Sequence, residues 1–251
     1  MEKSLPGLKE KFEIEQTNGG KMKKCIIFFM LLLGGLSAQG VSYNEKFQVN
    51  TFTDGNQWNP ELLSLPDGRF AVCWVSWGQD GSGCGVFGQI CNSDGERIGS
   101  EFQVNTYTDN DQENHKIASL PDGRFVACWA SLGQDGSAYG IYGQIFSSDG
   151  ERVGTEFQVN TYTDNNQGNP ELLSFPDGRF VVCWDSWHQD GSWCGVYGQV
   201  FTSEGERVGS EFQVNTHTDW SQVHAELLSL PDGKFVVCWN SYGQDGSAFG
   251  V

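Results

Sequence analysis

The residues best suited to bind a metal lie in a QDGS loop that occurs four times along the chain. Each copy offers a carboxylate and a hydroxyl, the oxygen ligands that Ca²⁺ prefers, although Ca²⁺ takes about six to eight of them. Aspartate followed by glycine is also typical of an Asx turn, in which the carboxylate accepts a hydrogen bond from a nearby backbone N–H. We expect the turn, with weak Ca²⁺ binding as the alternative, at Asp80, Asp135, Asp190 and Asp245.

Aromatic residues flank and enter this loop at positions that differ between the copies. Exposed aromatic rings stack on sugars or anchor protein partners, because they bury a large area at low entropic cost. The alternative role is packing, in which the rings cap the hydrophobic core. The candidate ligand-binding residues are Trp77, Tyr139, Trp187, Trp193 and Tyr242.

Catalytic arrangements are not evident in the sequence. The histidines fall at different repeat positions and have no fixed serine or cysteine partner, so they do not indicate a triad. Acid pairs such as Glu204 and Glu206 lie in predicted solvent turns, where a carboxyl has no reason for a raised pKa. We therefore expect no catalytic residues and a protein that is not an enzyme.

A repeat of 55 residues positions all of these side chains. The phrase FQVNT begins at Phe47, Phe102, Phe157 and Phe212, and each copy continues with PDG, CW and QDGS. A period of this size is typical of solenoids, propellers and arrays, in which each unit buries its apolar face against the next. Packing alone makes identical residues recur, so the repeat indicates architecture rather than activity.

The apolar residues of one copy alternate with a period of two, and turn residues separate the runs. In the third copy this pattern predicts four antiparallel strands, at 170–175, 179–186, 196–202 and 207–215. Four-stranded units repeated radially are the blades of a β-propeller. The expected fold class is therefore all-β, a β-propeller with four-stranded antiparallel blades.

The fourth copy is shorter than the others, since the copies span 47–101, 102–156, 157–211 and 212–251. Propellers have about four to eight complete blades, so we expect an incomplete or truncated ring. An unclosed ring leaves a sheet edge exposed, which predicts self-association through that edge.

A secretory signal precedes the repeats. Residues 22–38 combine a basic start, an apolar run and a small residue at Ala38, which is the pattern of a signal peptide. The run is too short for a comfortable membrane span. Residues 1–21 are an upstream segment without a pattern, so either Met1 or Met22 is the start. The remaining residues, 39–251, are expected to be secreted or on the extracellular surface, with no stable membrane span after cleavage.

Charge and cysteine usage restrict the partners and the redox chemistry. The formal net charge of −17 repels phosphate backbones, so nucleic acid is not an expected partner. The four equivalent cysteines are interpreted as small buried hydrophobes. The alternative is a Cys73 to Cys84 bridge, repeated as Cys183 to Cys194, in an oxidising compartment.

The consecutive phrases EFQVNTYT, PDGRFVVCW, QDGS and GVYGQVF resemble a tandem repeat of large secreted or surface-exposed microbial proteins, often found beside RTX and cadherin-like modules. The resemblance covers residues 45–251 and implies a propeller-like extracellular repeat of adhesion or matrix type. We therefore expect a secreted, non-catalytic binding or adhesion module for an extracellular glycan or protein. A purely structural spacer and a weak calcium-binding repeat are the alternatives.

Overall fold

The computed structural model describes residues 26–27, 30–31, 42–43 and 46–251. All regular structure in these residues is β-strand, and they contain no helix that could cross a membrane. The all-β expectation is confirmed. The expected upstream segment, and the expected signal peptide apart from Ile26–Ile27 and Met30–Leu31, lie outside the described residues.

Four antiparallel sheets follow one another along the chain. The first contains β5 (Gln57–Ser64), β6 (Phe70–Trp77), β7 (Cys84–Cys91) and β8 (Arg97–Gln103). The second contains β9 (Gln112–Ser119), β10 (Phe125–Leu132), β11 (Tyr139–Phe146) and β12 (Arg152–Gln158). The third contains β13 (Gln167–Ser174), β14 (Phe180–Trp187), β15 (Cys194–Phe201) and β16 (Arg207–Gln213). The fourth contains β17 (Gln222–Ser229), β18 (Phe235–Tyr242) and β19 (Phe249–Gly250).

The strands of each sheet are hydrogen-bonded in chain order, as a meander. The strands of the third sheet differ from those predicted by at most three residues at either end. Four shorter strands complete the described structure: β1 (Ile26–Ile27) pairs with β4 (Phe47–Gln48), and β2 (Met30–Leu31) pairs with β3 (Ser42–Tyr43). The expectation of four-stranded antiparallel blades is therefore confirmed.

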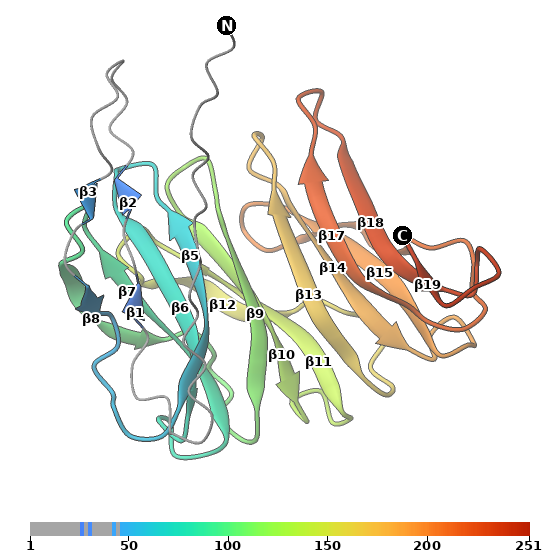
Figure 1. Ribbon diagram of the computed structural model, residues 1–251, viewed down its shortest axis with the longest axis horizontal. Helices are drawn as coiled ribbons and strands as arrows, with labels where there is room; N and C mark the ends of the chain where they lie inside the picture. Colours follow the sequence, from blue (N-terminus) through green and yellow to red (C-terminus); the bar gives the residue numbers. More distant parts are fainter. Residues whose placement is uncertain (1–25, 28–29, 32–41, 44–45) are drawn as a thin grey trace, which may run out of the picture.

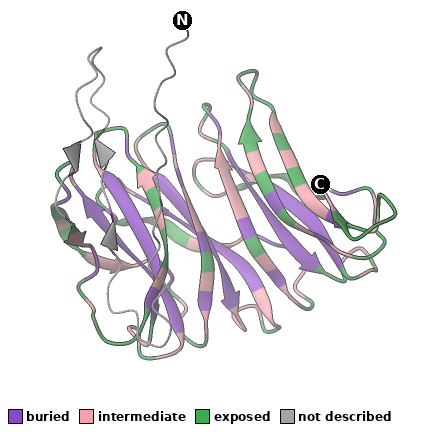
Figure 2. Ribbon diagram, in the orientation of Figure 1, coloured by how far each residue is buried: buried purple, intermediate pink, exposed green. Residues whose placement is uncertain are grey.

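The sheets stand side by side in chain order and do not close into a ring (Figure 1). Contacts link β5 to β9, β9 to β13 and β13 to β17, so the first strand of each sheet is its inner strand. Adjacent sheets pack face to face, which places the second and third strands of the first three sheets in the interior (Figure 2).

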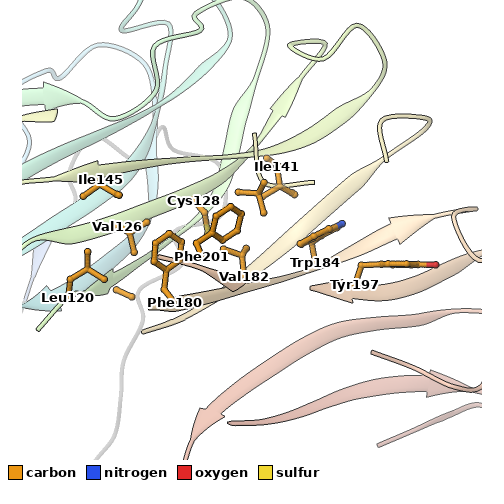
Figure 3. Close-up of a cluster of buried hydrophobic side chains, with 13 residues drawn as sticks. Leu120, Val126, Cys128, Ile141, Ile145, Phe180, Val182, Trp184, Tyr197 and Phe201 are labelled. Atoms are coloured by element: carbon orange, nitrogen blue, oxygen red, sulfur yellow. The ribbon is translucent and has the colours of Figure 1, made fainter. Parts of the chain in front are cut away.

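The core consists of the apolar faces between these sheets. Between the second and third sheets, Phe180, Val182 and Trp184 of β14 pack against Val126 and Cys128 of β10 (Figure 3). The equivalent tryptophans Trp74, Trp129 and Trp184 are all 0% exposed. Burial of an aromatic side chain of this size contributes about 3 kcal/mol to stability. These three tryptophans therefore stabilise the packing of sheet against sheet.

A glycine in the third strand of each complete sheet makes room for the phenylalanine of FQVNT. A Cβ on Gly143 would lie 2.8 Å from Cζ of Phe157. Gly88 meets Phe102, and Gly198 meets Phe212, in the same way. The glycine and the phenylalanine of the repeat are therefore a single packing unit.

All seven described cysteines are free thiols. The residue opposite Cys84 is Trp77, and the residue opposite Cys73 is Gly88. The expected alternative of a Cys73 to Cys84 bridge is therefore wrong, because the pairing of β6 with β7 keeps these two residues apart. Cys73, Cys128 and Cys183 are buried, as the hydrophobic interpretation predicts, whereas Cys238 is exposed on the fourth sheet.

Candidate functional site

Each inner strand carries a β-bulge at the same repeat position. In β5 the register shifts between Trp58 and Glu61, and β13 shifts between Gly168 and Glu171. The residue inside the bulge has a positive φ of 50° to 55° in all four copies: Asn59, Asn114, Asn169 and His224. Asparagine and histidine tolerate this conformation better than most residues. Bulges re-aim side chains and are frequent beside active sites.

The four bulges surround a hollow of about 490 Å³, which we call the central pocket. Three consecutive residues of every inner strand line it: 59–61, 114–116, 169–171 and 224–226. The central pocket is the place where all four repeats present side chains to one another. Repeated architecture thus brings residues that are distant in the sequence into one site.

Opposite charges meet inside the central pocket. The residue after the bulge is Glu61, Glu171 or Glu226 in three copies, and Lys116 in the second. Lys116 Nζ lies 2.9 Å from Glu171 Oε1 and 3.7 Å from Glu61 Oε1. The lysine of the second sheet therefore connects carboxylates of the first and third sheets.

The pKa values of this pair reflect burial and mutual attraction. Burial raises the pKa of Glu171 and outweighs the opposing effect of the Lys116 ammonium. Burial also acts to lower the pKa of Lys116, but the hydrogen bond and charge of Glu171, with the charges of Glu61 and Glu226, leave it raised. Glu171 thus holds its proton at a higher pH than an ordinary glutamate does.

A second perturbed carboxyl lies directly behind the pocket. Asp185 of β14 is 2% exposed, and its Oδ2 accepts a hydrogen bond of 2.8 Å from Asn169 Nδ2. Its Oδ1 accepts one of 3.0 Å from the backbone N–H of His224. Burial raises the pKa of Asp185 to about 6, against the effect of these two donors. Asp185 therefore ties the bulges of the third and fourth sheets together.

His115 is the buried histidine of the pocket wall. Burial lowers its pKa to about 4, so its ring is neutral at pH 7. Neither ring nitrogen makes a hydrogen bond of normal geometry, and the backbone of Cys73 has only a weak opposing effect on the pKa. Both ring nitrogens are buried, so this neutral imidazole lies beneath the surface of the pocket.

These groups break the repeat. Lys116 replaces a glutamate, His115 stands where the other copies have proline or alanine, and Asp185 stands where they have valine, alanine or asparagine. His224 replaces the asparagine of the bulge. Residues required by packing recur in every copy, whereas these four occur once each. The central pocket is thus an asymmetric site within a symmetric scaffold.

The structure does not bring the predicted metal candidates together. Each forms an Asx turn, in which its Oδ1 accepts from the backbone N–H two residues on, at 3.0 to 3.2 Å: Asp80, Asp135, Asp190 and Asp245. They lie in separate sheets, and the described residues contain no group of three His, Cys, Asp or Glu side chains suited to a metal ion. Ca²⁺ binding at these aspartates stays an untested prediction.

The predicted aromatic candidates fall into two groups. Trp77, Trp187, Trp193 and Tyr242 are exposed. Tyr139 is half-buried and packs against the core between the second and third sheets. Ligand binding by these residues stays a prediction, but the packing alternative describes Tyr139 better.

Comparison with known proteins gives matches among solved structures only. No protein-family model matches the sequence, and no curated protein matches it. A Dyadobacter fermentans protein of unknown function matches with a TM-score of 0.58 at 11% identity, over 80% of this chain and 62% of that protein. An α-L-arabinofuranosidase from Fusarium graminearum, in complex with an iminosugar inhibitor, matches with a TM-score of 0.55 at 13% identity, over 83% and 68%. The same fungal enzyme with arabinobiose gives 0.53 at 14%, over 84% and 68%.

These similarities, with the repeated sheets around one pocket, define the chain as a β-propeller whose sheets are not closed. At such low identity the likeness concerns the fold. This chain spans less than two thirds of the length of the Dyadobacter protein.

Two functional expectations are corrected. We expected a non-catalytic binding or adhesion module, with a spacer or a calcium-binding repeat as alternatives, and a protein that is not an enzyme. The similar structures with a stated activity are glycoside hydrolases, which contradicts both expectations. The physical premise was also incomplete, because it considered acids in turns and overlooked the carboxyls with raised pKa values at Glu171 and Asp185.

Proposed function

We propose that this protein is a glycoside hydrolase whose reaction takes place in the central pocket. The observation that carries the proposal is the pair formed by Glu171 and Glu61, two carboxylates from different sheets that approach the same lysine ammonium. Since these oxygens lie 2.9 and 3.7 Å from Lys116 Nζ, they can be no more than about 7 Å apart, an upper limit that allows the spacing of about 5 to 5.5 Å of retaining glycoside hydrolases.

The two carboxyls suit different roles. Hydrolysis of a glycosidic bond needs one carboxylic acid to protonate the leaving oxygen, and one carboxylate to act as base or nucleophile. Glu171 suits the acid, because burial favours its protonated form. Glu61 has a more exposed side chain and suits the carboxylate. Lys116 holds both side chains in place and limits how far the pKa of Glu171 rises.

The polar lining of the pocket suits sugar hydroxyl groups. The exposed Asn59, Asn114 and Asn169 offer amide donors and acceptors. A negatively charged protein disfavours anionic glycans, so the substrate we propose is neutral. Arabinose-containing glycans are the first choice, because the similar fungal structure was determined with arabinobiose.

We also propose that the enzyme acts outside the cell. The signal-peptide pattern of residues 22–38 and the resemblance to tandem repeats of secreted microbial proteins support this location. Leu228 and Val236 are exposed on the far face of the fourth sheet. These two apolar side chains support self-association of the chain through this sheet. Extracellular glycan is the partner that follows from the activity.

The test is hydrolysis of 4-nitrophenyl α-L-arabinofuranoside and of soluble arabinan, with xylan as a comparison. Loss of the general acid in Glu171→Gln should lower kcat/KM on soluble arabinan by about 10² to 10⁴-fold, because the alkoxide leaving group of a glycan needs protonation, whereas 4-nitrophenolate does not. Glu206→Gln is the matched control, since Glu206 is an exposed turn residue of the same sheet, and it should leave the rate unchanged. Undiminished activity of Glu171→Gln, or a wild-type protein without turnover on these substrates, would refute the proposal.

A further inference from the structure

Two bulky residues between the third and fourth sheets hold a backbone conformation that the other repeats give to small residues. Trp220 has a φ of 64°, and its equivalents are Gly55, Asn110 and Asn165, with φ of 62° to 70°. His188 has a φ of 64°, and its equivalents are Gly78, Gly133 and Gly243, with φ of 72° to 79°. A positive φ is costly for a side chain as bulky as that of Trp220, whereas histidine tolerates it better, and such strain gathers at functional sites. Because glycine or asparagine serves the fold in the other copies, packing does not require these two side chains.

Both residues belong to a row of exposed aromatic side chains, which we call the aromatic strip: Trp187, His188, Trp193, Trp220 and Tyr242. The exposed fractions of its tryptophans and tyrosine are 42%, 54%, 55% and 40% in that order. Ring centroids are 6.1 Å apart for Trp187 and His188, 6.4 Å for His188 and Trp193, and 6.0 Å for Trp220 and Tyr242. The backbone N–H of Trp220 donates to Ser192 Oγ at 3.0 Å and joins the two halves of the strip.

The strip is confined to this part of the rim. The residues equivalent to Trp193 are Gly83, Ala138 and Ala248, and those equivalent to Trp220 are one glycine and two asparagines. A single exposed hydrophobic residue needs no explanation, but a contiguous exposed patch marks an interaction site. Here the repeat does not require the patch, and Trp220 within it holds a strained backbone conformation.

The strip and the central pocket share inner strands. Trp220 precedes β17 by two residues, and His224 of β17 lines the pocket. At about 3.3 Å per residue in a strand, four residues correspond to about 13 Å. On the other side, the backbone N–H of Trp187 donates to the carbonyl of Asn166 at 2.9 Å, directly before β13. A short oligosaccharide that contacts the strip is therefore long enough to reach the pocket.

We propose that the aromatic strip binds a neutral oligosaccharide, one end of which reaches the central pocket. Flat rings with polar edges match sugars, which present C–H faces for stacking and hydroxyl groups for hydrogen bonds. Indole N–H, phenol O–H and imidazole nitrogen supply those bonds, whereas the net charge of −17 disfavours anionic polymers. The statement that one end of the oligosaccharide reaches the pocket rests on the proposed hydrolase function, but the statement that the oligosaccharide binds at the strip does not.

Trp220→Asn tests the proposal with the residue that two other repeats use. If Trp220 is retained for ligand binding, the variant loses strain and its Tm should rise by about 2 to 4 °C. Its affinity for arabinopentaose or xylopentaose, measured by isothermal titration calorimetry, should fall at least about tenfold, as for loss of an aromatic anchor. If Trp220 instead has a structural role, Trp220→Asn should have a lower Tm and an unchanged affinity. That result would overturn the proposal.

Two further variants separate this inference from the proposed function. Trp77→Leu removes an exposed tryptophan of the first sheet, where the second repeat has Leu132, and it should bind the pentaoses as the wild type does. Glu171→Gln should bind them with the affinity of the wild type but without hydrolysis. Failure of the wild type to bind either pentaose, or an equal loss in Trp77→Leu, would overturn the assignment of the strip whether or not the protein is a hydrolase.

Discussion

Asp185 should make the stability of the protein depend on pH in a direction opposite to that of most carboxyl groups. Its pKa of about 6 in the folded protein exceeds the ordinary value of 3.8, because the side chain is buried behind the central pocket. The folded state therefore binds this proton more tightly than the unfolded state does. The stabilisation is complete below pH 3.8 and is lost as the pH rises through 6.

The size of the effect follows from the two pKa values. A difference of this size corresponds to about 3 kcal/mol, and no discount for solvent applies because Asp185 is 2% exposed. In Asp185→Asn this dependence is absent. The fourth repeat has Asn240 at the same position, so an amide fits this strand. Between pH 4 and pH 7.5 the free energy of unfolding of the variant, relative to wild type, should rise by about 2.5 kcal/mol, or about 5 to 10 °C in Tm.

The assay is urea unfolding followed by tryptophan fluorescence at several pH values, with wild type and variant in parallel so that other titrating groups cancel. His224→Asn is the matched control, because the other three repeats have asparagine at this position. The variant also retains the backbone N–H that donates a hydrogen bond to Asp185. Its profile should have the same sign as that of wild type and lie at slightly higher pH, because the charge of His224 lowers the pKa of Asp185. A difference between wild type and Asp185→Asn that is constant with pH, or that falls as the pH rises, would refute the reasoning.

Two other measurements test the packing. Trp129→Ala should destabilise the protein by about 3 to 5 kcal/mol in urea unfolding, because Trp129 is fully buried between the first and second sheets, whereas Trp77→Ala at an exposed position should change it by less than about 0.5 kcal/mol. An equal loss in both variants would contradict the packing described. A thiol reagent should label the exposed Cys238 in the native protein, as detected by peptide mass spectrometry. Burial raises the pKa of Cys73 to about 12, so this thiol should react only after unfolding. Labelling of Cys73 in the native protein would contradict its burial.

The fold could be predicted because its determinants are local and repeated. The alternation of apolar residues and the PDG turns predicted the strands of the third copy to within three residues. The tryptophan of CW recurs in all four copies, and it is fully buried at Trp74, Trp129 and Trp184 but only partly buried at Trp239. Each of these features depends on one repeat and its neighbour, so a single sequence contains the information.

The central pocket could not be predicted in the same way, because its residues come from separate repeats and meet through a bulge. The register shift after Gly168 has no strong mark in the sequence. A signal was nevertheless present: Lys116 interrupts a series of glutamates at one repeat position. Asp185 gave less warning, since its burial and its contacts with Asn169 and the backbone of His224 arise only in the folded protein. Trp220 was also missed, although it replaces turn residues.

The contrast between repeated scaffold and unrepeated pocket has a consequence for how such a gene can change. Nearly identical tandem segments recombine unequally, and the loss of one 55-residue copy would join equivalent positions without disturbing the packing of sheet on sheet. Removal of the second copy would delete His115 and Lys116, whereas removal of the third would delete Glu171 and Asp185. Either event would leave a well-packed shorter protein that lacks half of its pocket chemistry. Natural variants that differ by one whole copy should therefore fold alike and differ in activity.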